Sequence, residues 1–443
     1  MDAMKFVVDY QIVQRGADGC AQVSFGGALP PEHAGKQVWA RAVREDDTLE
    51  ICPWQRCEAA DGVWQTSLTL PAGGPYWLEA RAQGEGDTLE WSPRIKRVSH
   101  VGVGELYLLA GQSNMAGYGR DAAYDPPELG VHLYGNNGCW SVAAHPLNDS
   151  VDTIYPENAE HASNTSPALS FARMLRRRLG VPVGLVQASL GGSPLSRWHP
   201  EETGDLYRAM LRRLDAVGQV GGVLWYQGCT DTDTEEWADG YLARFRRMVE
   251  LWRADLGNVP IVTVQINRVK QGAPDDAHDR RWARVREAQR RAALEIDRLV
   301  VVPANDLACT DGIHNSSGSN VILGERMAHA ALKAFYGQPG LAAPNLRRAV
   351  RVDATHLRLE FGPGFTLRMM DGRDTGLDVE DAQGRARCVS GVPCEGGIVL
   401  TAEREFTLPA RFSAYWQAEV PPFIARDLSG MPMLSCYGVP VEG

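Results

Sequence analysis

The chain has 443 residues, and at roughly 150 residues per domain this length suggests about three domains. A hydrophobic content of 44% with 23% charged residues is typical of a folded globular protein and excludes a disordered or fibrous chain. The formal net charge of -10 argues against nucleic acid or an anionic membrane as a partner, because binding to polyanions relies on a surplus of Lys and Arg.

Residues 1–98 are predicted to form a small N-terminal β domain. Short alternating segments, such as 63–68 and 76–80, lie between Gly and Pro turns, and no long helical periodicity is present. The start of the chain offers only Lys5 before a short apolar patch that Asp9 and Gln11 interrupt, which is not typical of a secretory signal.

No run of eighteen apolar residues is found, so we expect no transmembrane span. The nine cysteines are odd in number and widely scattered, a pattern that fits reduced thiols better than a disulfide framework. Together these features favour a cytoplasmic location.

Residues 99–344 are predicted to form an α/β domain. Near-continuous apolar runs, as expected for strands buried on both faces, lie at 106–110, 183–188, 222–226, 261–266 and 299–303. Amphipathic, helix-like stretches lie between or after them, at 168–179, 206–217, 236–256, 282–297 and 321–335. This alternation predicts a doubly wound parallel sheet whose functional groups collect at the carboxyl ends of the strands.

Residues 345–443 return to short alternating strands, for example at 357–361 and 397–400, with several Gly turns. They predict a second, C-terminal β domain of the sandwich type. The expected fold class is therefore an α/β domain flanked by N- and C-terminal β domains.

Ser113 follows the first buried strand, between Gly111 and the pair Ala116 and Gly117. A hydroxyl there sits at the carboxyl end of the strand, where glycines let the backbone turn sharply and leave amide hydrogens free to bind an oxyanion. Alone, a serine in such a turn is more often a cap, since Ser favours these places.

The segment Asp-Gly-Ile-His at 311–314 follows the fifth strand and precedes the last helix. Asp311 can hold the Nδ1–H of His314 and leave Nε2 to take a proton from Ser113. Alone, the segment also fits a turn with a capping Asp. Asp and His are also metal ligands, but no close cluster of His or Cys supplies the third and fourth positions, so neither a metal site nor a cofactor is predicted. The conjunction with Ser113 favours a serine hydrolase.

Two pairs of motifs carry a family resemblance. Gly-Gln-Ser-Asn-Met at 111–115 and Asp-Gly-Ile-His at 311–314 resemble the SGNH hydrolases, and specifically the branch of sialate O-acetylesterases and acetylxylan esterases. Ala-Ser-Leu-Gly-Gly-Ser-Pro-Leu-Ser-Arg-Trp at 188–198 and Val-Leu-Trp-Tyr-Gln-Gly at 223–228 resemble the second and third blocks of that branch. Four blocks in the family's order are far more specific than any one of them.

The resemblance implies a flavodoxin-like catalytic domain with Ser113 as nucleophile and His314 and Asp311 as its partners. It further implies an oxyanion hole made by the backbone N–H of Ser113, the N–H of Gly192 and the side-chain amide of Gln227. Gly191 is an alternative to Gly192, because either glycine can present the amide while its neighbour permits the turn.

Several neighbours have two interpretations. Gln112 and Asn114, beside the nucleophile, are expected to touch substrate or to orient the loop, and Asn114 also fits a hydrogen bond within its own turn. Trp198 is a candidate sugar-stacking wall, with Trp140 a weaker one, and each also fits a core position. Gln227 also fits a polar strand end that bonds neighbouring backbone.

One position departs from the family pattern. Cys229 stands where the family commonly has Glu, and Asp231 is the candidate for a partial replacement. This departure bears on the substrate range, whereas the nucleophile, the base and the oxyanion donors are retained.

The predicted function is that of a serine carbohydrate O-acetylesterase working through an acetyl-serine intermediate. The first-choice substrate is an O-acetylated sialic acid, and acetylated xylan or another glycan is the second; neither nucleic acid nor membrane is expected as a partner. An alternative of another class is a non-catalytic carbohydrate-binding protein on the same fold, against which the joint presence of Ser113, Asp311 and His314 argues.

Overall fold

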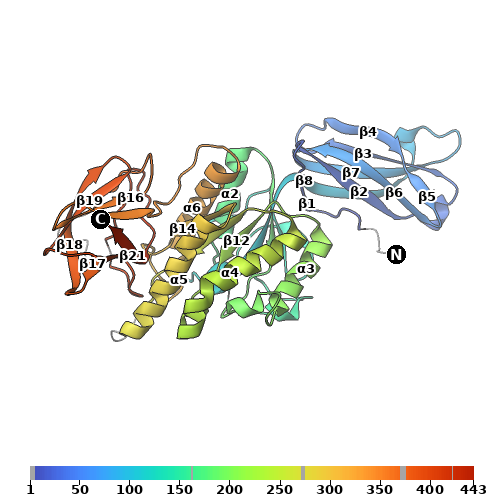
Figure 1. The fold of residues 1–443 in the computed structure, drawn as a ribbon. Coiled ribbons are helices and arrows are strands. Elements are labelled where there is room, and N and C mark those ends of the chain that lie inside the picture. Colours follow the sequence, from blue (N-terminus) through green and yellow to red (C-terminus); the bar gives the residue numbers. More distant parts are fainter. Residues whose placement is uncertain (1–4, 161–162, 271–274, 370–375, 422) are drawn as a thin grey trace.

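A computed structural model describes residues 5–160, 163–270, 275–369, 376–421 and 423–443. The chain forms three hydrophobic cores, which lie in a row from the N-terminal β domain through the α/β domain to the C-terminal β domain (Figure 1). The candidate site lies in the central domain, so the fold is described outward from it.

The N-terminal domain consists of two packed sheets whose apolar residues alternate inward, as Val23 and Phe25 do between exposed Gln22 and Ser24. Its strands are β1 (Ile12–Gln14), β2 (Cys20–Ala28), β3 (Gln37–Arg44), β4 (Glu50–Arg56), β5 (Glu58–Ala60), β6 (Val63–Pro71) and β7 (Gly73–Gln83). One sheet has the order β2-β6-β5, and β3 of the other sheet pairs with β4 and β7.

Strand β8 (Arg94–Gly111) joins the N-terminal and central domains without a linker. Near its start Val98 pairs with Leu78 of β7, whereas from Glu105 onward it pairs with the parallel strands of the central sheet. The boundary predicted between residues 98 and 99 therefore falls inside one continuous strand.

The central sheet has the order β10-β9-β11-β8-β12-β13-β14, and all neighbours are parallel except β10 with β9. Its strands besides β8 are β9 (Val131–Tyr134), β10 (Trp140–Val142), β11 (Val183–Gln187), β12 (Gly222–Tyr226), β13 (Ile261–Gln265) and β14 (Leu299–Pro303). The five predicted strands are present, and β9 and β10 were missed because both are short and β9 carries a polar His132.

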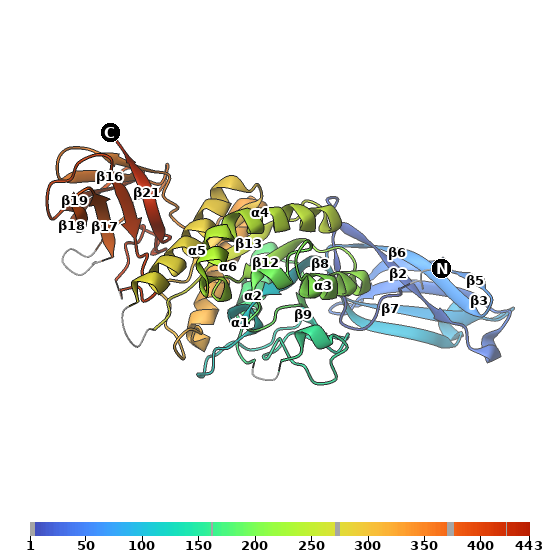
Figure 2. The same cartoon turned by 60° about the horizontal axis from the view of Figure 1, so that its bottom comes forward.

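Helices cover both faces of this sheet: α2 packs against α6, and α4 packs against α5 (Figures 1 and 2). The helices are α1 (Ser113–Ala116), α2 (Ala168–Leu179), α3 (Asp205–Val217), α4 (Glu235–Leu256), α5 (Asp276–Glu295) and α6 (Ser317–Phe335). Helix α5 begins six residues before the predicted start, because Asp275 caps it by accepting hydrogen bonds from the N–H groups of Ala277 and His278.

The C-terminal domain is a closed barrel, so the prediction of a sandwich is wrong. Its strands are β15 (Arg348–Arg351), β16 (His356–Glu360), β17 (Leu377–Asp381), β18 (Gly384–Cys394), β19 (Gly397–Ala402), β20 (Arg411–Ala414) and β21 (Cys436–Glu442). The last strand pairs in parallel with the first, β15, which closes the sheet. Alternation in sequence reveals strands but not this long-range pairing.

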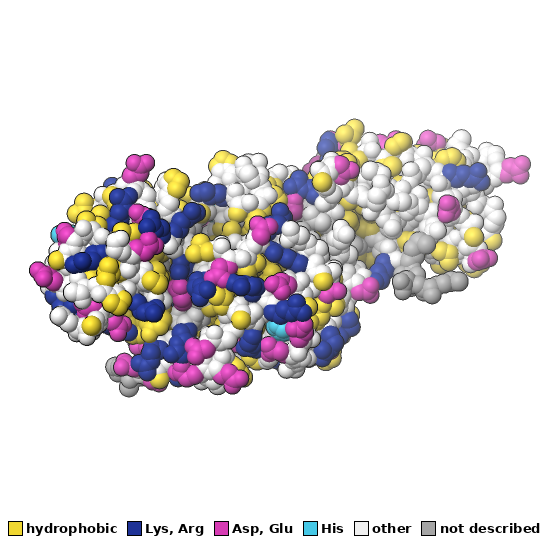
Figure 3. All heavy atoms as spheres, viewed as in Figure 1, with side chains coloured by type: hydrophobic (Ala, Val, Ile, Leu, Met, Phe, Trp, Pro, Cys, Tyr) yellow, Lys and Arg dark blue, Asp and Glu magenta, His cyan; other side chains and the backbone are white. Residues whose placement is uncertain are grey.

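Charged side chains of both signs are interspersed over the face on which α4 and α5 lie (Figure 3). Ion pairs link these helices to their surroundings, for example Arg244 with Glu202 at 2.6 Å and Arg284 with Asp239 at 3.1 Å. In the described part of the chain, every helix is too short or too polar to cross a lipid bilayer.

Candidate active site

Ser113 lies at the first residue of α1, two residues after β8 ends at the centre of the sheet. The turn requires glycine at Gly111, which has a φ of 130° and where a Cβ would stand 2.3 Å from the carbonyl oxygen of Tyr226. The backbone N–H of Ser113 has no recorded acceptor among the described residues, as expected for the first turn of a helix.

The loop after β14 brings His314 to this serine, although the two residues are 201 positions apart. The Nε2 of His314 lies 3.0 Å from Ser113 Oγ, and its Nδ1 lies 2.8 Å from Asp311 Oδ2. The three side chains therefore form a continuous hydrogen-bonded line in which the imidazole stands between the hydroxyl and the carboxylate.

Asp311 is held as an acceptor by its own loop. Its Oδ1 accepts hydrogen bonds from the N–H groups of Ile313 at 2.9 Å and of His314 at 2.8 Å. Burial raises the pKa of the Asp311 carboxyl, but the hydrogen bonds from His314 and from these backbone groups outweigh it and leave the pKa below its ordinary value. The carboxylate is therefore ionised at neutral pH and orients the imidazole.

Asn114 connects the turn of the nucleophile to the loop after β14 that carries His314. It does not line the pocket, so the expectation that it contacts substrate is not supported. Its Oδ1 accepts from the N–H of Asn315 at 2.9 Å, and its Nδ2 donates to the carbonyl of Ile313 at 3.3 Å. Because the side chain is 1% exposed and bonded at both ends, it fixes the distance between Ser113 and His314.

The two glycines of the second block are distinguished by their hydrogen bonds. The N–H of Gly191 donates to Glu160 Oε2 at 3.2 Å, whereas the N–H of Gly192 has no recorded acceptor among the described residues. Gly192 also has a φ of 63° and lines the pocket beside Ser113. Of the two, Gly192 is the better placed to donate to an oxyanion.

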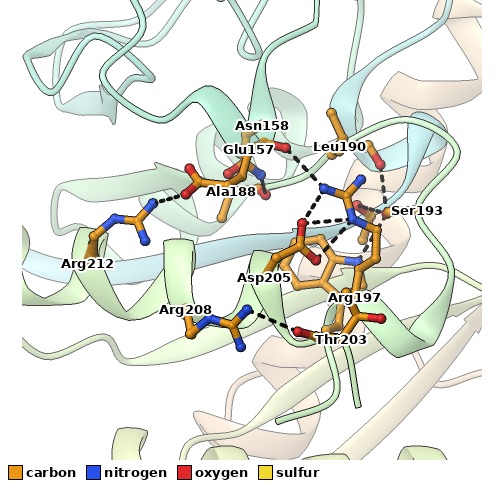
Figure 4. A network of polar contacts seen from close by, with 12 residues as sticks. Glu157, Asn158, Ala188, Leu190, Ser193, Arg197, Thr203, Asp205, Arg208 and Arg212 are labelled. Carbon is orange, nitrogen blue, oxygen red and sulfur yellow. Dashed lines mark hydrogen bonds and ion pairs between the residues drawn. The ribbon is translucent and has the colours of Figure 1, made fainter.

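Polar contacts brace the turn between Leu190 and Ser193 (Figure 4), which carries Gly192. Asn158 donates to the carbonyl of Ala188 at the end of β11, and Ser193 Oγ donates to the carbonyl of Leu190 at 2.8 Å. Farther along, Arg197 forms an ion pair with Asp205 at the first residue of α3, at 2.5 Å. A turn braced at both ends keeps its amides in place.

Trp198 is a core residue, so its assignment to substrate binding is wrong. Its side chain is 0% exposed, its Nε1 donates to Ser193 Oγ at 3.1 Å, and its ring packs edge-on against Trp225 with centroids 5.5 Å apart. Trp140, the weaker candidate, is also buried and packs against Tyr134. Both rings face the interior, because the strands and helices around them need large apolar fillers.

The side-chain amide of Gln227 is occupied, so the structure does not support it as an oxyanion donor. Its Nε2 donates to Asp231 Oδ2 at 2.5 Å and to the carbonyl of Ser193 at 3.2 Å, while its Oε1 accepts from Tyr241 at 3.0 Å. An amide nitrogen carries two hydrogens, and both have acceptors here. Gln227 therefore braces the second block from below the pocket.

Asp231 anchors the loop in which Cys229 departs from the family pattern. Its Oδ2 also accepts from the N–H of Leu195 at 2.9 Å, and its Oδ1 accepts from Arg244 at 3.3 Å. Cys229 lines the pocket, and burial raises the pKa of its thiol to about 12, so the thiol stays neutral. Asp231 thus supplies a buried carboxylate in this loop where Cys229 does not.

Gln112 lines the pocket, as expected of a residue beside the nucleophile. Its Oε1 accepts from the N–H of Gly228 at 3.0 Å and from that of Thr230 at 3.3 Å. Its main contacts therefore hold the 228–230 loop against the nucleophile turn.

Tyr118 and Glu160 join the site although the sequence analysis missed them. The ring of Tyr118 lies 4.6 Å from that of His314, centroid to centroid, and its hydroxyl donates to Glu160. Burial and the bond to Glu160 raise the pKa of this hydroxyl, so it stays a donor. Glu160 thus links the ring beside the base to Gly191. Only Tyr118, five residues after Ser113, offered a signal in sequence.

The pocket around Ser113 has a volume of about 350 Å³, at the lower end of the usual range for small-molecule sites. Its lining residues are Gln112, Ser113, Tyr118, Gly191, Gly192, Cys229, Thr230, Asp233, Ile313 and His314. Within the described residues, groups of three or more metal-ligating side chains suited to a metal ion are absent. A pocket of this size suits a small-molecule ligand.

Comparison with known sequences gives a matching family model and several relatives. Residues 103–333 match the family model described as carbohydrate esterase, sialic acid-specific acetylesterase. The chain is 28% identical over 269 residues to a probable carbohydrate esterase of Arabidopsis thaliana, covering 56% of this chain and 96% of the plant protein. It is 25% identical over 234 residues to human sialate O-acetylesterase, covering 44% of this chain and 43% of the human enzyme.

Among solved structures, a carbohydrate acetylesterase from Xanthomonas citri matches with a TM-score of 0.68 and 22% sequence identity. The match covers 97% of each chain, so it includes both β domains as well as the central one. At this identity the similarity concerns the fold. The chain covers less than half of the length of the human sialate O-acetylesterase.

Proposed function

Because the chain belongs to the carbohydrate esterase family of sialic acid-specific acetylesterases, we propose that it removes acetyl groups from O-acetylated sugars by a serine mechanism on an SGNH-type fold. The family membership predicted from the four sequence blocks is confirmed, and the chain is an ester-hydrolysing enzyme. One observation carries the mechanism: Ser113 Oγ, His314 and Asp311 stand in line at 3.0 and 2.8 Å.

In the proposed reaction His314 Nε2 takes the proton of Ser113 as its oxygen attacks the acetyl carbonyl carbon. Negative charge grows on the carbonyl oxygen. The N–H groups of Ser113 and Gly192 are available to donate hydrogen bonds to it. Asp311 stabilises the imidazolium, which then protonates the departing sugar oxygen. Water, activated by His314, attacks the acetyl-serine and releases acetate.

An O-acetylated sialic acid is the first candidate substrate. The description of the matching family and the name of the human relative support it. An ester on an exposed sugar hydroxyl also fits a small pocket in which Ser113 remains accessible with 7% of its surface exposed.

A neutral acetylated sugar is the second candidate, and the charge of the pocket favours it. Asp233 lines the pocket with an exposed carboxylate, and the described lining residues include neither Lys nor Arg. A carboxylate accepts hydrogen bonds from sugar hydroxyls but repels the carboxylate of a sialic acid.

Hydrolysis of p-nitrophenyl acetate by the wild type and by Ser113→Ala tests the mechanism. We expect a loss of at least about 10⁴-fold in kcat with an unchanged melting temperature, because the substitution removes the nucleophile and no packing. Equal activity in the two proteins would remove Ser113 from the mechanism.

Acetate release from 9-O-acetylated sialic acid and from acetylated xylan oligomers separates the two substrate candidates. Under the second candidate, Asp233→Asn raises kcat/KM for the sialic acid relative to the xylan oligomer, by roughly fivefold, since about 1 kcal/mol of repulsion is removed. A ratio that stays constant while sialic acid is the better substrate supports the first candidate instead.

A further inference from the structure

Arg286 on α5 is a fully buried cation between the central sheet and the C-terminal domain. Its side-chain hydrogen bonds to the described residues all go to backbone carbonyls and none goes to a carboxylate. Burial lowers the pKa of the guanidinium to about 10, so it stays protonated at neutral pH. A buried charge is tolerated only where hydrogen bonds replace water, so these carbonyls determine its position.

The carbonyls belong to two segments far apart in the chain. Arg286 Nε donates to Ile266 at 3.1 Å and Nη2 donates to Asn267 at 2.6 Å, both directly after β13. Nη1 donates to Gln417 at 2.5 Å and Nη2 to Ala418 at 3.2 Å, in the segment after β20 of the barrel. One guanidinium therefore clamps the C-terminal domain to the carboxyl end of a central strand.

The strand end that Arg286 binds is also bonded to the loop of residues 308–316, which carries His314 and is called the base loop below. The side-chain Nδ2 of Asn267 donates to the carbonyl of Ile313 at 2.7 Å and to Asn315 Oδ1 at 2.9 Å. These two acceptors flank His314 in sequence. Nearby, the N–H of Lys270 donates to the carbonyl of Gly312 at 2.8 Å, and that of Val269 donates to Ala418 at 3.0 Å. Residues 267–270 thus bond to the barrel segment on one side and to the base loop on the other.

We propose that Arg286 is a positioning residue for His314, which it acts on through Asn267, and that the C-terminal domain thereby completes the active site. The inference rests on the proposed function, since it assumes that His314 is the base. The guanidinium holds the backbone of Asn267, and the Asn267 side chain holds both flanks of His314. A shift of about 1 Å at a base can cost about 10²-fold in rate.

Arg290 provides a matched control, because it lies one helical turn farther along α5. It is 5% exposed and also binds the C-terminal part of the chain, donating to Asn345 Oδ1 at 3.1 Å and to the carbonyl of Leu346 at 2.5 Å. No bond from Arg290 to residues 266–270 or 308–316 is recorded in the described structure. Its loss weakens the same interface without touching the base loop.

The first experiment compares Arg286→Lys with Arg290→Lys in the full-length chain, using p-nitrophenyl acetate. A lysine keeps the charge but loses the planar fork that reaches both segments. We expect Arg286→Lys to lower kcat by about 10- to 100-fold with KM within about threefold, and Arg290→Lys to leave kcat within about threefold. Equal kcat in the two variants, or an unchanged kcat in Arg286→Lys, overturns the proposal.

A second experiment begins with a variant that leaves Arg286 intact. Asn267→Ser removes the donor to Ile313 but leaves the backbone carbonyl that Arg286 binds, and we expect the same fall in kcat. In the double variant the losses are less than additive if Arg286 acts through Asn267. Fully additive losses, or a kcat of Asn267→Ser equal to that of the wild type, overturn the proposal that Arg286 acts through Asn267.

A third measurement separates failure of this inference from failure of the proposed function. Proton NMR detects the Nδ1–H of His314 in its bond to Asp311, identified by its loss in His314→Ala, without any substrate. We expect the signal to weaken or shift in Arg286→Lys and to persist in Arg290→Lys. An unchanged signal contradicts the inference whatever the activity. Activity that survives in Ser113→Ala contradicts the proposed function, even where the signal responds to Arg286→Lys as expected.

Discussion

Gln227 shows how a residue can stand beside the oxyanion turn and still be unable to donate to the substrate. Both hydrogens of its side-chain amide have acceptors inside the protein, on Asp231 and on the carbonyl of Ser193. Burial raises the pKa of the Asp231 carboxyl, and the bond from Gln227 opposes that rise. Gln227 therefore contributes to stability, because without its amide the buried acceptors on Asp231 and Ser193 would lose a donor, which is costly.

Gln227→Ala is therefore expected to lower the free energy of unfolding by about 1–3 kcal/mol and kcat by less than about tenfold. Chemical denaturation and p-nitrophenyl acetate kinetics measure the two effects. Gln289→Ala is the control, since Gln289 is an equally buried amide that donates to the carbonyl of Gln227. A loss of about 10²–10³ in kcat at unchanged stability would instead make Gln227 an oxyanion donor.

At the scale of elements, the second block is supported by an aromatic cluster between β12 and α4. Trp198 packs against Trp225 and Trp252, and Trp252 Nε1 donates to the carbonyl of Trp198 at 3.0 Å. Phe245 of α4 stacks on Trp225 with ring centroids 5.9 Å apart. The turn with Gly192 therefore rests on closely packed rings, which leave it little room to move.

Trp198→Ala is expected to lower the free energy of unfolding by about 3–5 kcal/mol, because it leaves a large cavity in this cluster. Thermal or urea unfolding measures the loss. Trp91→Ala, at a side chain that is 89% exposed, is the control and should leave stability within about 0.5 kcal/mol. If Trp198→Ala raised KM for an acetylated sugar without loss of stability, the ring would be a substrate wall after all.

At the scale of the whole molecule, elements and side chains that reach across the domain boundaries hold the three domains together. Strand β8 belongs to two sheets, and Arg286 binds both the central strand end and the barrel segment. A third junction is His132 of β9, whose Nδ1–H donates to the carbonyl of Tyr10 at 2.6 Å while Nε2 accepts from the N–H of Gly130 at 3.2 Å. These bonds require the neutral imidazole.

Burial lowers the pKa of His132 from its ordinary value to about 4. The unfolded chain therefore binds a proton at higher pH than the folded one, so stability is present above about pH 6.5 and is lost as the pH falls towards 4. Between pH 7 and pH 5 the loss attributable to this residue is roughly 2 kcal/mol.

Urea unfolding at pH 7 and pH 5 tests this, with His132→Asn expected to flatten the pH dependence by that amount. Identical pH dependence in the wild type and His132→Asn would show that His132 does not titrate with folding.

Much of the arrangement could be predicted because it is local. The five buried strands, the glycine turn around Ser113 and the Asp311 to His314 spacing each depend on a few consecutive residues. The rule that parallel strands present their carboxyl ends at one edge then predicts that Ser113 and His314 meet, as they do at 3.0 Å. The same rule, applied to Asn267 at the end of β13, would have found that residue too.

The other features of the fold and of the site depend on contacts between residues that are far apart in the chain. Closure of the barrel depends on β21 reaching β15, and the burial of Trp198 depends on α4 covering it. The hydrogens of Gln227 are taken by groups that only folding brings near, and Glu160 reaches Gly191 from a loop of its own. Neighbouring residues therefore indicate which groups can act, whereas long-range packing determines which of them remain free to meet a substrate.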